Sequence, residues 1–330
     1  MSATFWAPGR VNLIGEHTDY SGGLVLPVAI QLGITLTVEP AERIALVSEG
    51  DRVDLAANGS GEAYGWGRYV AAVARELDAL GRPAVGIEGV VEADLPRGAG
   101  LGASGALGIA LALALCAVAD FEPAPFDLVL ACQRAEQLAV GVPSGILDQA
   151  ASLLGRAGHA LLLDCSTLDH RWVALPKKLA ILVVDSGERH TLEASGYAQR
   201  RRELEAGDPR RVRHVANENR RVRATVAALE RDDLPALGAL FAESHASLRD
   251  DFEVSTSTLD ELVDAAVAAG AVGARLTGGG FGGSIVALAE RDNADRVLEG
   301  ILQREGAQGW VIRSADGATR RRTDSPPGRA

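Results

Sequence analysis

Short apolar runs and longer periodic stretches divide the first half of the chain into two kinds of predicted element. Apolar-rich runs predict strands at residues 11–14, 34–38, 44–47 and 85–91. Elsewhere apolar residues recur every three or four positions, which predicts helices at residues 67–80, 104–119 and 126–140.

The second half of the chain repeats this mixture. The same patterns predict strands at residues 180–185 and 284–289, and helices at residues 211–229, 234–248 and 259–269. Because strands and helices do not alternate strictly, we expect α+β sandwich domains rather than a doubly wound parallel sheet.

The length of 330 residues is enough for about two domains. Pro176 interrupts the pattern near residues 175–178, so we expect an N-terminal domain over residues 1–176 and a C-terminal domain over residues 177–330. The last residues, 315–330, lack apolar periodicity, and we expect them to form a frayed, disordered tail.

The amino-acid composition mainly excludes certain classes of protein. A net charge of −11 argues against binding to nucleic acids or anionic membranes, which requires an excess of basic residues. Lys177 and Lys178 are the only lysines, and no G-x-x-x-x-G-K-[ST] motif occurs, which excludes a P-loop nucleotide hydrolase. Three widely spaced cysteines form no disulfide pattern, and no signal peptide or membrane span is visible, so we expect a cytoplasmic, soluble protein.

Two glycine-rich segments are candidates for ligand binding. Residues 98–105 (GAGLGASG) lie between a predicted strand and a predicted helix, where backbone N–H groups and the helix N-terminus favour an anion such as phosphate. A tight turn or a dinucleotide-binding turn remain alternatives. Residues 277–283 (TGGGFGG) precede a strand, so they predict a loop over a ligand or a flexible hairpin loop.

Polar side chains follow the first predicted strand. In residues 7–20 (APGRVNLIGEHTDY), Glu16, His17 and Asp19 come after an apolar strand that we expect to end at Gly15. Three hydrogen-bonding side chains suit a ligand with several hydroxyl groups, since a carboxylate can accept two hydrogen bonds. A solvated loop is the alternative, and the spacing is weak for a metal site.

Two further acidic residues lie near a predicted helix start. Glu136 is on the helix at 126–140, and Pro143 and Ser144 predict the start of another helix with Asp148 in or near its first turn. In isolation, an acid such as Asp148 is often only a partner of the helix dipole, and an acid such as Glu136 is usually a surface charge.

Together these segments resemble the galactokinases of the GHMP small-molecule kinase family. The resemblance runs from about Phe5 to Leu288 and rests on residues 10–20, 95–104, 135–149, 195–202, 244–255 and 275–283. It implies a two-domain α+β fold, with a ribosomal-protein-S5-like N-terminal domain, a ferredoxin-like C-terminal domain and the active site between them.

The resemblance also implies a reaction: transfer of the ATP γ-phosphoryl group to the C1 hydroxyl of α-D-galactose, the first committed step of the Leloir route. ATP would be the co-substrate and Mg²⁺ the cofactor of an expected monomer.

By position, the resemblance implies a role for each matching residue. Asp148 would be the general base and Arg10 its partner. Galactose would be held by Glu16, His17, Asp19, Gly145 and Tyr197. Nucleotide would contact Gly98, Ala99, Gly100, Leu101, Gly102, Ala103 and Ser104, with Ser48 as a further candidate. Mg²⁺ would be bound by Ser104 and Glu136.

The chain departs from the family pattern in the nucleotide loop and beyond it. Residues 101–106 read LGASGA where galactokinases usually carry LSSSAS, so Gly102 and Ala103 lack two hydroxyl groups. Ser144 stands where cysteine is frequent. The segment between Arg202 and Arg211 is about 30 residues shorter than in relatives, judged from typical loop and helix sizes. A kinase of another sugar, a catalytically weak galactose-binding regulator and a dinucleotide-dependent enzyme are the competing hypotheses.

Overall fold

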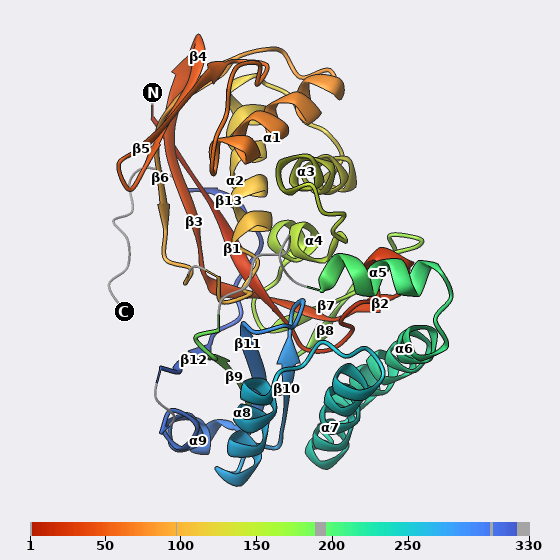
Figure 1. The fold of residues 1–330 in the computed structure, drawn as a ribbon. Coiled ribbons are helices and arrows are strands. Elements are labelled where there is room, and N and C mark those ends of the chain that lie inside the picture. The colour runs from red at the N-terminus through yellow and green to blue at the C-terminus, as the bar shows by residue number, and fades with distance from the viewer. Residues whose placement is uncertain (1, 97, 189–195, 304–305, 322–330) are drawn as a thin grey trace.

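The strands of the N-terminal half pair into a six-stranded sheet in the order β13-β1-β3-β6-β4-β5 (Figure 1). The computed structural model describes residues 2–96, 98–188, 196–303 and 306–321. Within these, the strands of the sheet are β1 (Ala3–Asn12), β3 (Pro27–Ala41), β4 (Arg43–Ser48), β5 (Asp51–Ala56), β6 (Gly86–Ala93) and β13 (Thr319–Arg321).

Four helices cover one face of this sheet: α1 (Gly67–Ala79), α2 (Ala103–Val118), α3 (Pro125–Val140) and α4 (Leu147–Leu154). Helices α2 and α4 pack directly on β1 and β3, while α1 and α3 pack around α2. Because neighbours surround α2, its residues are apolar on nearly every side, and Ile109, Leu111 and Leu115 are completely buried.

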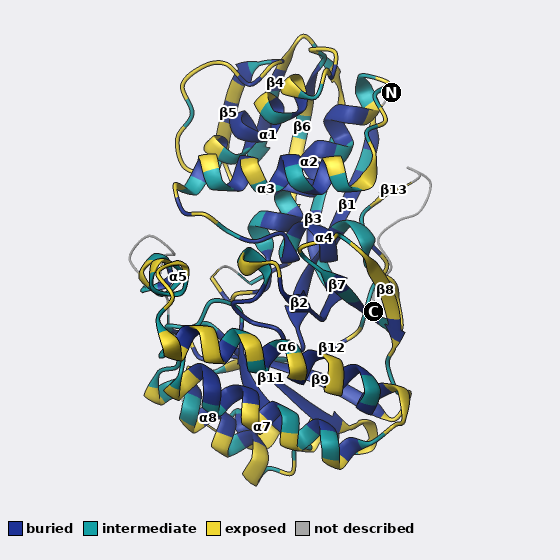
Figure 2. Ribbon diagram, turned by 90° about the vertical axis from the view of Figure 1, so that its right-hand side faces the viewer, coloured by how far each residue is buried: buried dark blue, intermediate teal, exposed yellow. Residues whose placement is uncertain are grey.

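A second lobe is built on a four-stranded antiparallel sheet in the order β10-β11-β9-β12. Its strands are β9 (Leu179–Asp185), β10 (Gly273–Thr277), β11 (Ser284–Glu290) and β12 (Gln308–Ile312), and its helices are α5 (Tyr197–Glu205), α6 (Pro209–Glu230), α7 (Leu234–Asp250), α8 (Ser257–Ala268) and α9 (Ala294–Ile301). Figure 2 shows buried residues gathered between this sheet and its helices, with exposed residues on the outer helix faces.

A small sheet joins the two lobes. It contains β2 (Leu24–Val25), β7 (His159–Asp164) and β8 (His170–Ala174), in the order β2-β7-β8. Strand β7 also contacts β3 of the six-stranded sheet, which we call the upper sheet and which with its helices forms the upper lobe. Helix α6 of the second lobe packs against β2 and β8. Consequently the segment between β1 and β2 is held between the lobes.

The structure confirms the expected α+β class and each predicted helix to within a few residues. The first predicted strand was misplaced: β1 ends at Asn12, before Leu13 and Ile14, and begins at Ala3. Nearly every residue of β1 is buried, so its sequence does not alternate. The helix after Pro143 starts at Leu147, with Asp148 in its first turn as predicted.

The expectation of a frayed tail from residue 315 is wrong for its described part. Residues 319–321 form β13, which pairs antiparallel with Thr4, Phe5 and Trp6 of β1. Just before it, the Gly317 and Ala318 N–H groups donate to the carbonyls of Gly155 and Ser152. Backbone pairing needs no apolar periodicity, which explains the wrong expectation. Residues 322–330 lie outside the described part of the chain.

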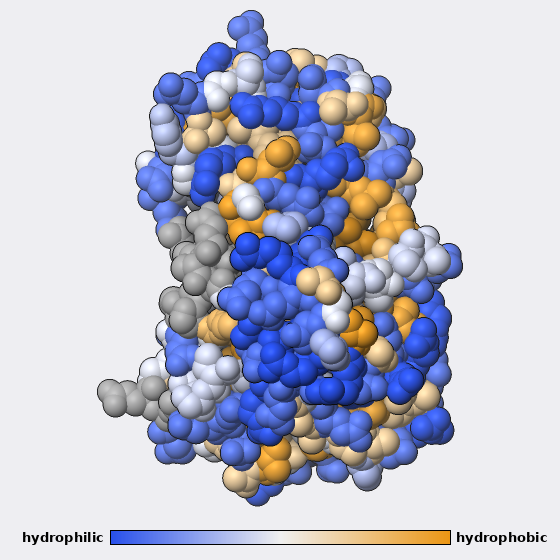
Figure 3. All heavy atoms as spheres, turned by 45° about the vertical axis from the view of Figure 1, so that its right-hand side comes forward, coloured by the Kyte–Doolittle hydropathy of each residue, from blue (hydrophilic) through white to orange (hydrophobic). Residues whose placement is uncertain are grey.

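Among the described helices, none combines the length and the apolar character needed to cross a bilayer. Figure 3 shows hydrophilic side chains over most of one face, with apolar groups in separate areas.

Candidate active site

A cleft of about 340 Å³ lies between the lobes and collects the motifs that sequence analysis singled out. Its walls come from the end of β1 and the loop after it, the loop before α2, the start of α4, the N-terminus of α5 and the glycine loop between β10 and β11. The predicted residues that line it are Arg10, Glu16, His17, Asp19, Gly98, Gly100, Leu101, Gly102, Ala103, Ser104, Glu136, Gly145, Asp148 and Tyr197.

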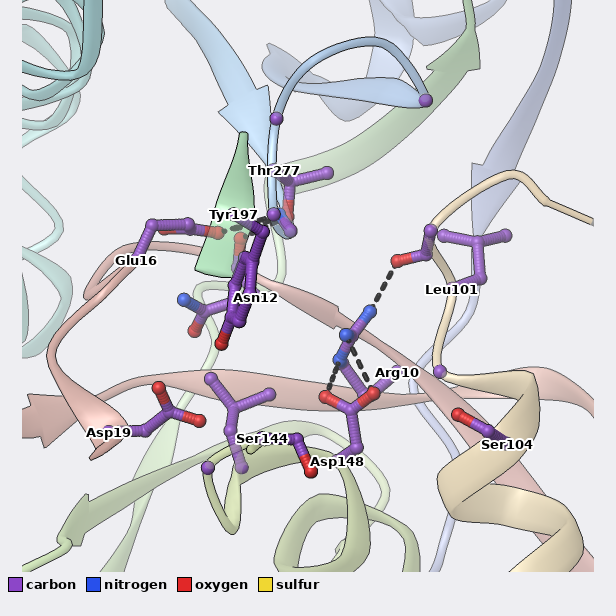
Figure 4. Close-up of a pocket in the computed structure, with 18 of the residues that line it drawn as sticks. Arg10, Asn12, Glu16, Asp19, Leu101, Ser104, Ser144, Asp148, Tyr197 and Thr277 are labelled. Atoms are coloured by element: carbon purple, nitrogen blue, oxygen red, sulfur yellow. Dashed lines mark hydrogen bonds and ion pairs between the residues drawn. The ribbon is translucent and has the colours of Figure 1, made fainter. Parts of the chain in front are cut away.

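An ion pair between Arg10 and Asp148 stands in the middle of the cleft (Figure 4). Arg10 Nε donates to Asp148 Oδ1 over 2.6 Å, and Nη2 donates to Oδ2 over 2.8 Å. This two-point contact fixes the plane of the carboxylate. The third nitrogen of Arg10, Nη1, donates to the Gly100 carbonyl, so one guanidinium joins β1, α4 and the loop before α2.

The loop at residues 98–102 presents its backbone to the cleft. Gly102 has a φ of 73°, a left-handed conformation that favours glycine, and it caps the N-terminus of the 16-residue helix α2. The Ser104 side chain follows in the first turn. Within the loop Ala99 is buried, and its carbonyl accepts a hydrogen bond from Ser284 Oγ at 2.6 Å. The N-terminus of α2 and the backbone of this loop suit an anionic ligand.

Ser48 is not brought to the cleft. It ends β4, which β3 and β6 separate from β1, and it is not among the described residues that line the cleft. Its contact with nucleotide stays a prediction. Because β4 runs parallel to β6, Ser48 lies at the end of the sheet from which the chain continues into the loop at residues 98–102.

Glu136 forms a buried acidic position beside Asp148. Its carboxylate accepts hydrogen bonds from Ser104 Oγ, from Ser144 Oγ at 3.2 Å and from Gln149 Nε2 at 2.7 Å. Burial, with the charge of Asp148 added, raises the pKa of Glu136. No cation among the described residues pairs with Glu136, so the position favours a bound cation.

The loop after β1 folds back so that its side chains face the cleft. His17 adopts a φ of 61° and stacks on Phe252 with ring centroids 4.4 Å apart. Burial lowers the pKa of His17 to about 3, which leaves the imidazole neutral at physiological pH. Its Nδ1 lies 2.9 Å from the Tyr20 hydroxyl.

Asp19, Gly145 and Tyr197 converge on the same part of the cleft. A methyl group at Gly145 would overlap the Asp19 carboxylate, so only glycine permits this approach. Tyr197, the first residue of α5, lies with its ring 5.5 Å from that of His17. Ser195, which opens the predicted motif around Tyr197, lies outside the described residues.

Three family models match the chain: the galactokinase galactose-binding signature at residues 2–40, the GHMP kinase N-terminal domain at residues 68–156 and the GHMP kinase C-terminal domain at residues 225–308. A galactokinase of Roseiflexus sp. (strain RS-1) is 39% identical over 95% of this chain and 92% of its own. The chain belongs to the galactokinases of the GHMP kinase family. A Bos taurus galactokinase is 40% identical over 94% of this chain and 90% of its own.

Solved structures agree with the family. A Lactococcus lactis galactokinase complexed with galactose superimposes with a TM-score of 0.89 at 30% identity, covering 96% of this chain and 95% of its own. A Methanococcus jannaschii mevalonate kinase shares the fold, with a TM-score of 0.74 at 20% identity and a coverage of 95% of this chain and 98% of its own. The expected two-domain α+β GHMP kinase fold is therefore confirmed.

Glu16 of this galactokinase, for which sequence analysis predicted a contact with the sugar, is buried against the second lobe. Its carboxylate pairs with the fully buried Arg275 and also accepts hydrogen bonds from Thr277 Oγ1 at 3.2 Å and the Gly278 N–H at 3.1 Å. Burial raises the pKa of Glu16, while Arg275 opposes that shift. Glu16 thus fastens the loop after β1 to the glycine loop of the other lobe.

Glu218 is a buried residue that sequence analysis missed. It accepts hydrogen bonds from the Gly15 N–H at 3.0 Å, from Ser244 Oγ at 2.7 Å and from Arg221 Nε at 2.7 Å. Although burial disfavours its charge, Arg275, His214 and Arg221 bring the pKa of Glu218 to about 2. In the sequence it lies in a polar stretch of a long helix, which looks like a solvated face.

Asp19 gives a prediction about stability. Burial, together with the charge of Asp148, raises its pKa from 3.8 to about 6. Because the folded state holds the proton more tightly than the unfolded chain, the ionised carboxylate lowers stability as the pH rises through this range. Asp19→Asn keeps an oxygen for the Tyr20 N–H and removes the charge. We expect it to raise Tm by a few degrees at pH 8, corresponding to about 1–2 kcal/mol once water in the cleft is allowed for.

The measurement is thermal unfolding of both proteins between about pH 4 and pH 8. The stability gain should shrink toward pH 4, where the wild-type carboxyl is protonated in the folded state. An Asp19→Asn protein that is less stable than wild type at pH 8 would show that the charge is stabilising.

Proposed function

We propose that this chain transfers the γ-phosphoryl group of ATP to the C1 hydroxyl of α-D-galactose, giving galactose 1-phosphate and ADP. The observation that carries the proposal is the Arg10–Asp148 pair, which stands between the loop at residues 98–102 and the loop that holds Asp19. One side of the pair offers backbone N–H groups to phosphates, and the other offers acceptors to sugar hydroxyls.

In this proposal Asp148 accepts the proton of the C1 hydroxyl as that oxygen bonds to phosphorus. A sugar hydroxyl is a poor nucleophile, and a carboxylate within hydrogen-bond reach removes its proton as the bond forms. Arg10 holds the carboxylate plane through two hydrogen bonds. Its positive charge also stabilises the negative charge on the transferring group.

The sugar would be held by Asp19, His17 and Tyr197, with Gly145 giving it space beside Asp19. The neutral His17 ring can exchange a hydrogen bond with a hydroxyl without adding charge. Glu16 lines this region too, but its main part in the proposal is to position the loops, since three protein groups already donate to it. Residues 98–104 would contact the phosphates. Within this segment Ala99 is buried, and its carbonyl holds the loop in place through Ser284.

Ser104 and Glu136 would hold Mg²⁺. A carboxylate and a hydroxyl are oxygen ligands that this hard cation accepts, with phosphate and water oxygens completing its shell. The fit is supported by the burial of Glu136 among neutral donors, because a cation there would offset the cost of its charge. Bound Mg²⁺ supplies neutralisation of charge on the phosphate oxygens.

We propose that the enzyme acts as a monomer. We place the enzyme in the cytoplasm, where ATP is available.

Asp148→Asn tests the proposed base. We expect kcat to fall by about 10³–10⁴-fold, since general base catalysis contributes at this level, while ATP affinity changes by no more than about twofold. ADP release with galactose, glucose, N-acetylgalactosamine and arabinose measures the effect and the sugar preference together. Asp232→Asn, an exposed carboxylate paired with Lys178, is the matched control. Near-normal turnover by Asp148→Asn would exclude Asp148 as the base.

Gly105→Ala tests whether the short side chains of α2 set the position of the base. A methyl group at Gly105 would come 2.7 Å from Asp148 Cβ, so the carboxylate must shift. We expect kcat to fall by about 10- to 100-fold, because misplacement by around 1 Å has this effect. Gly108→Ala on the same helix is the control, since its methyl group would meet its nearest atom at 3.6 Å. Equal kcat values for the two variants would refute the idea.

Gly145→Ala tests the sugar side of the cleft. The added methyl group must displace the Asp19 carboxylate, so we expect galactose to bind about 100-fold more weakly while ATP affinity is unchanged. Calorimetric titration with each ligand measures this, and Gly108→Ala again serves as the control. Normal galactose affinity in Gly145→Ala would remove Asp19 from the sugar site.

A further inference from the structure

Asn12 is a buried polar residue in the cleft for which the proposed mechanism gives no role. It ends β1 two residues after Arg10, so strand alternation places both side chains on the face that borders the cleft. Only 1% of its surface is exposed. Figure 4 shows its amide near Tyr197, on the side of the cleft that holds Glu16 and Asp19.

Backbone groups orient the Asn12 side chain. Its Oδ1 accepts a hydrogen bond at 3.3 Å from the Leu26 N–H, a donor that it shares with the Ile14 carbonyl at 3.1 Å, so the amide nitrogen faces away from that backbone. Its backbone carbonyl accepts from Thr277 Oγ1 at 3.0 Å, which ties the residue to the other lobe. Among the described residues, no acceptor pairs with Asn12 Nδ2.

A buried donor without a partner is unusual, since burial removes its hydrogen bonds to water without replacing them. Such a group is best explained when a ligand supplies the missing acceptor. In Figure 4 Asn12 lies on the same side of Arg10 as Asp19 and Tyr197, which belong to the proposed sugar side of the cleft, whereas Leu101 and Ser104 of the proposed phosphate side lie on the other side of Arg10.

We propose that Asn12 Nδ2 donates a hydrogen bond to a hydroxyl oxygen of the bound sugar, which makes Asn12 a further substrate-binding residue. The inference rests on the proposed function, because it needs a sugar in this part of the cleft. A neutral donor adds to the site what its carboxylates lack: Asp19 and Asp148 can only accept when ionised, while each sugar hydroxyl offers both a proton and lone pairs.

Asn12→Asp is the sharpest variant, because it retains an oxygen for the Leu26 N–H and replaces the donor. We expect galactose to bind about 10- to 50-fold more weakly and ATP affinity to change by less than about twofold. Asn219→Asp is the matched control. Asn219 likewise accepts from a backbone N–H, that of Leu24 at 2.7 Å, but it does not line the cleft. Galactose affinity should be unchanged in this control.

A series of monodeoxygalactoses, each lacking the hydroxyl at C1, C2, C3, C4 or C6, separates a direct contact from a general disturbance. If Asn12 contacts one hydroxyl, the analogue lacking it binds wild type and Asn12→Asp equally, while the other analogues show the full loss. An equal loss for every analogue, or unchanged galactose affinity, would overturn the proposed contact. Absence of galactose binding and of ADP release by the wild type would instead overturn the proposed function.

Discussion

The arrangement of the cleft depends on a buried guanidinium, that of Arg275 on β10. It pairs with Glu16, donates to the Leu13 carbonyl at 2.8 Å and lies 3.8 Å from Glu218. Two carboxylates and two guanidiniums, with Arg221 as the second, share this dry region between the lobes. Removing one member of such a group leaves its partner charged and unpaired, which costs about 3–5 kcal/mol. The charges therefore fix how the loop after β1 meets the second lobe.

From that anchor, small residues allow the catalytic groups to approach one another. Gly102 lies against Arg10 and Asp148, Gly105 against Asp148, and Gly145 against Asp19. At each of these glycines, a side chain would push the neighbouring charged group out of its position. Asp19 and Glu136 are thus both held near the carboxylate of Asp148. Burial and repulsion from Asp148 therefore raise the pKa values of Asp19 and Glu136. In the proposed function, cations and hydrogen-bond donors of the ligands offset this unfavourable charge.

The local sequence pattern was sufficient to predict most of the helices and strands. The motifs chosen from the sequence also proved to lie together in the structure. The helices were predicted well because apolar periodicity directly reflects which face packs on a sheet. The motifs at residues 7–20, 98–105, 141–149 and 277–283 did meet in one cleft. What local pattern lacks is information about partners distant in the chain. The pairing of Glu16 with Arg275 spans 259 positions, and the bond from Glu218 to the Gly15 N–H spans 203. Neither could be inferred from neighbours in sequence, and the same limit hid the position of Ser48 and the unpaired amide of Asn12.

Strand β13 has a consequence for how the molecule can be divided. The chain leaves the upper sheet before β9 and comes back to it after β12, so the two lobes are connected by two crossings rather than one. Two connections restrict twisting of one lobe against the other. They also mean that the upper lobe is not a contiguous stretch of sequence. A fragment cut near residue 176 would expose the Thr4–Trp6 edge of β1, with unpaired backbone groups beside the buried Phe5 and Trp6. Such an edge promotes aggregation.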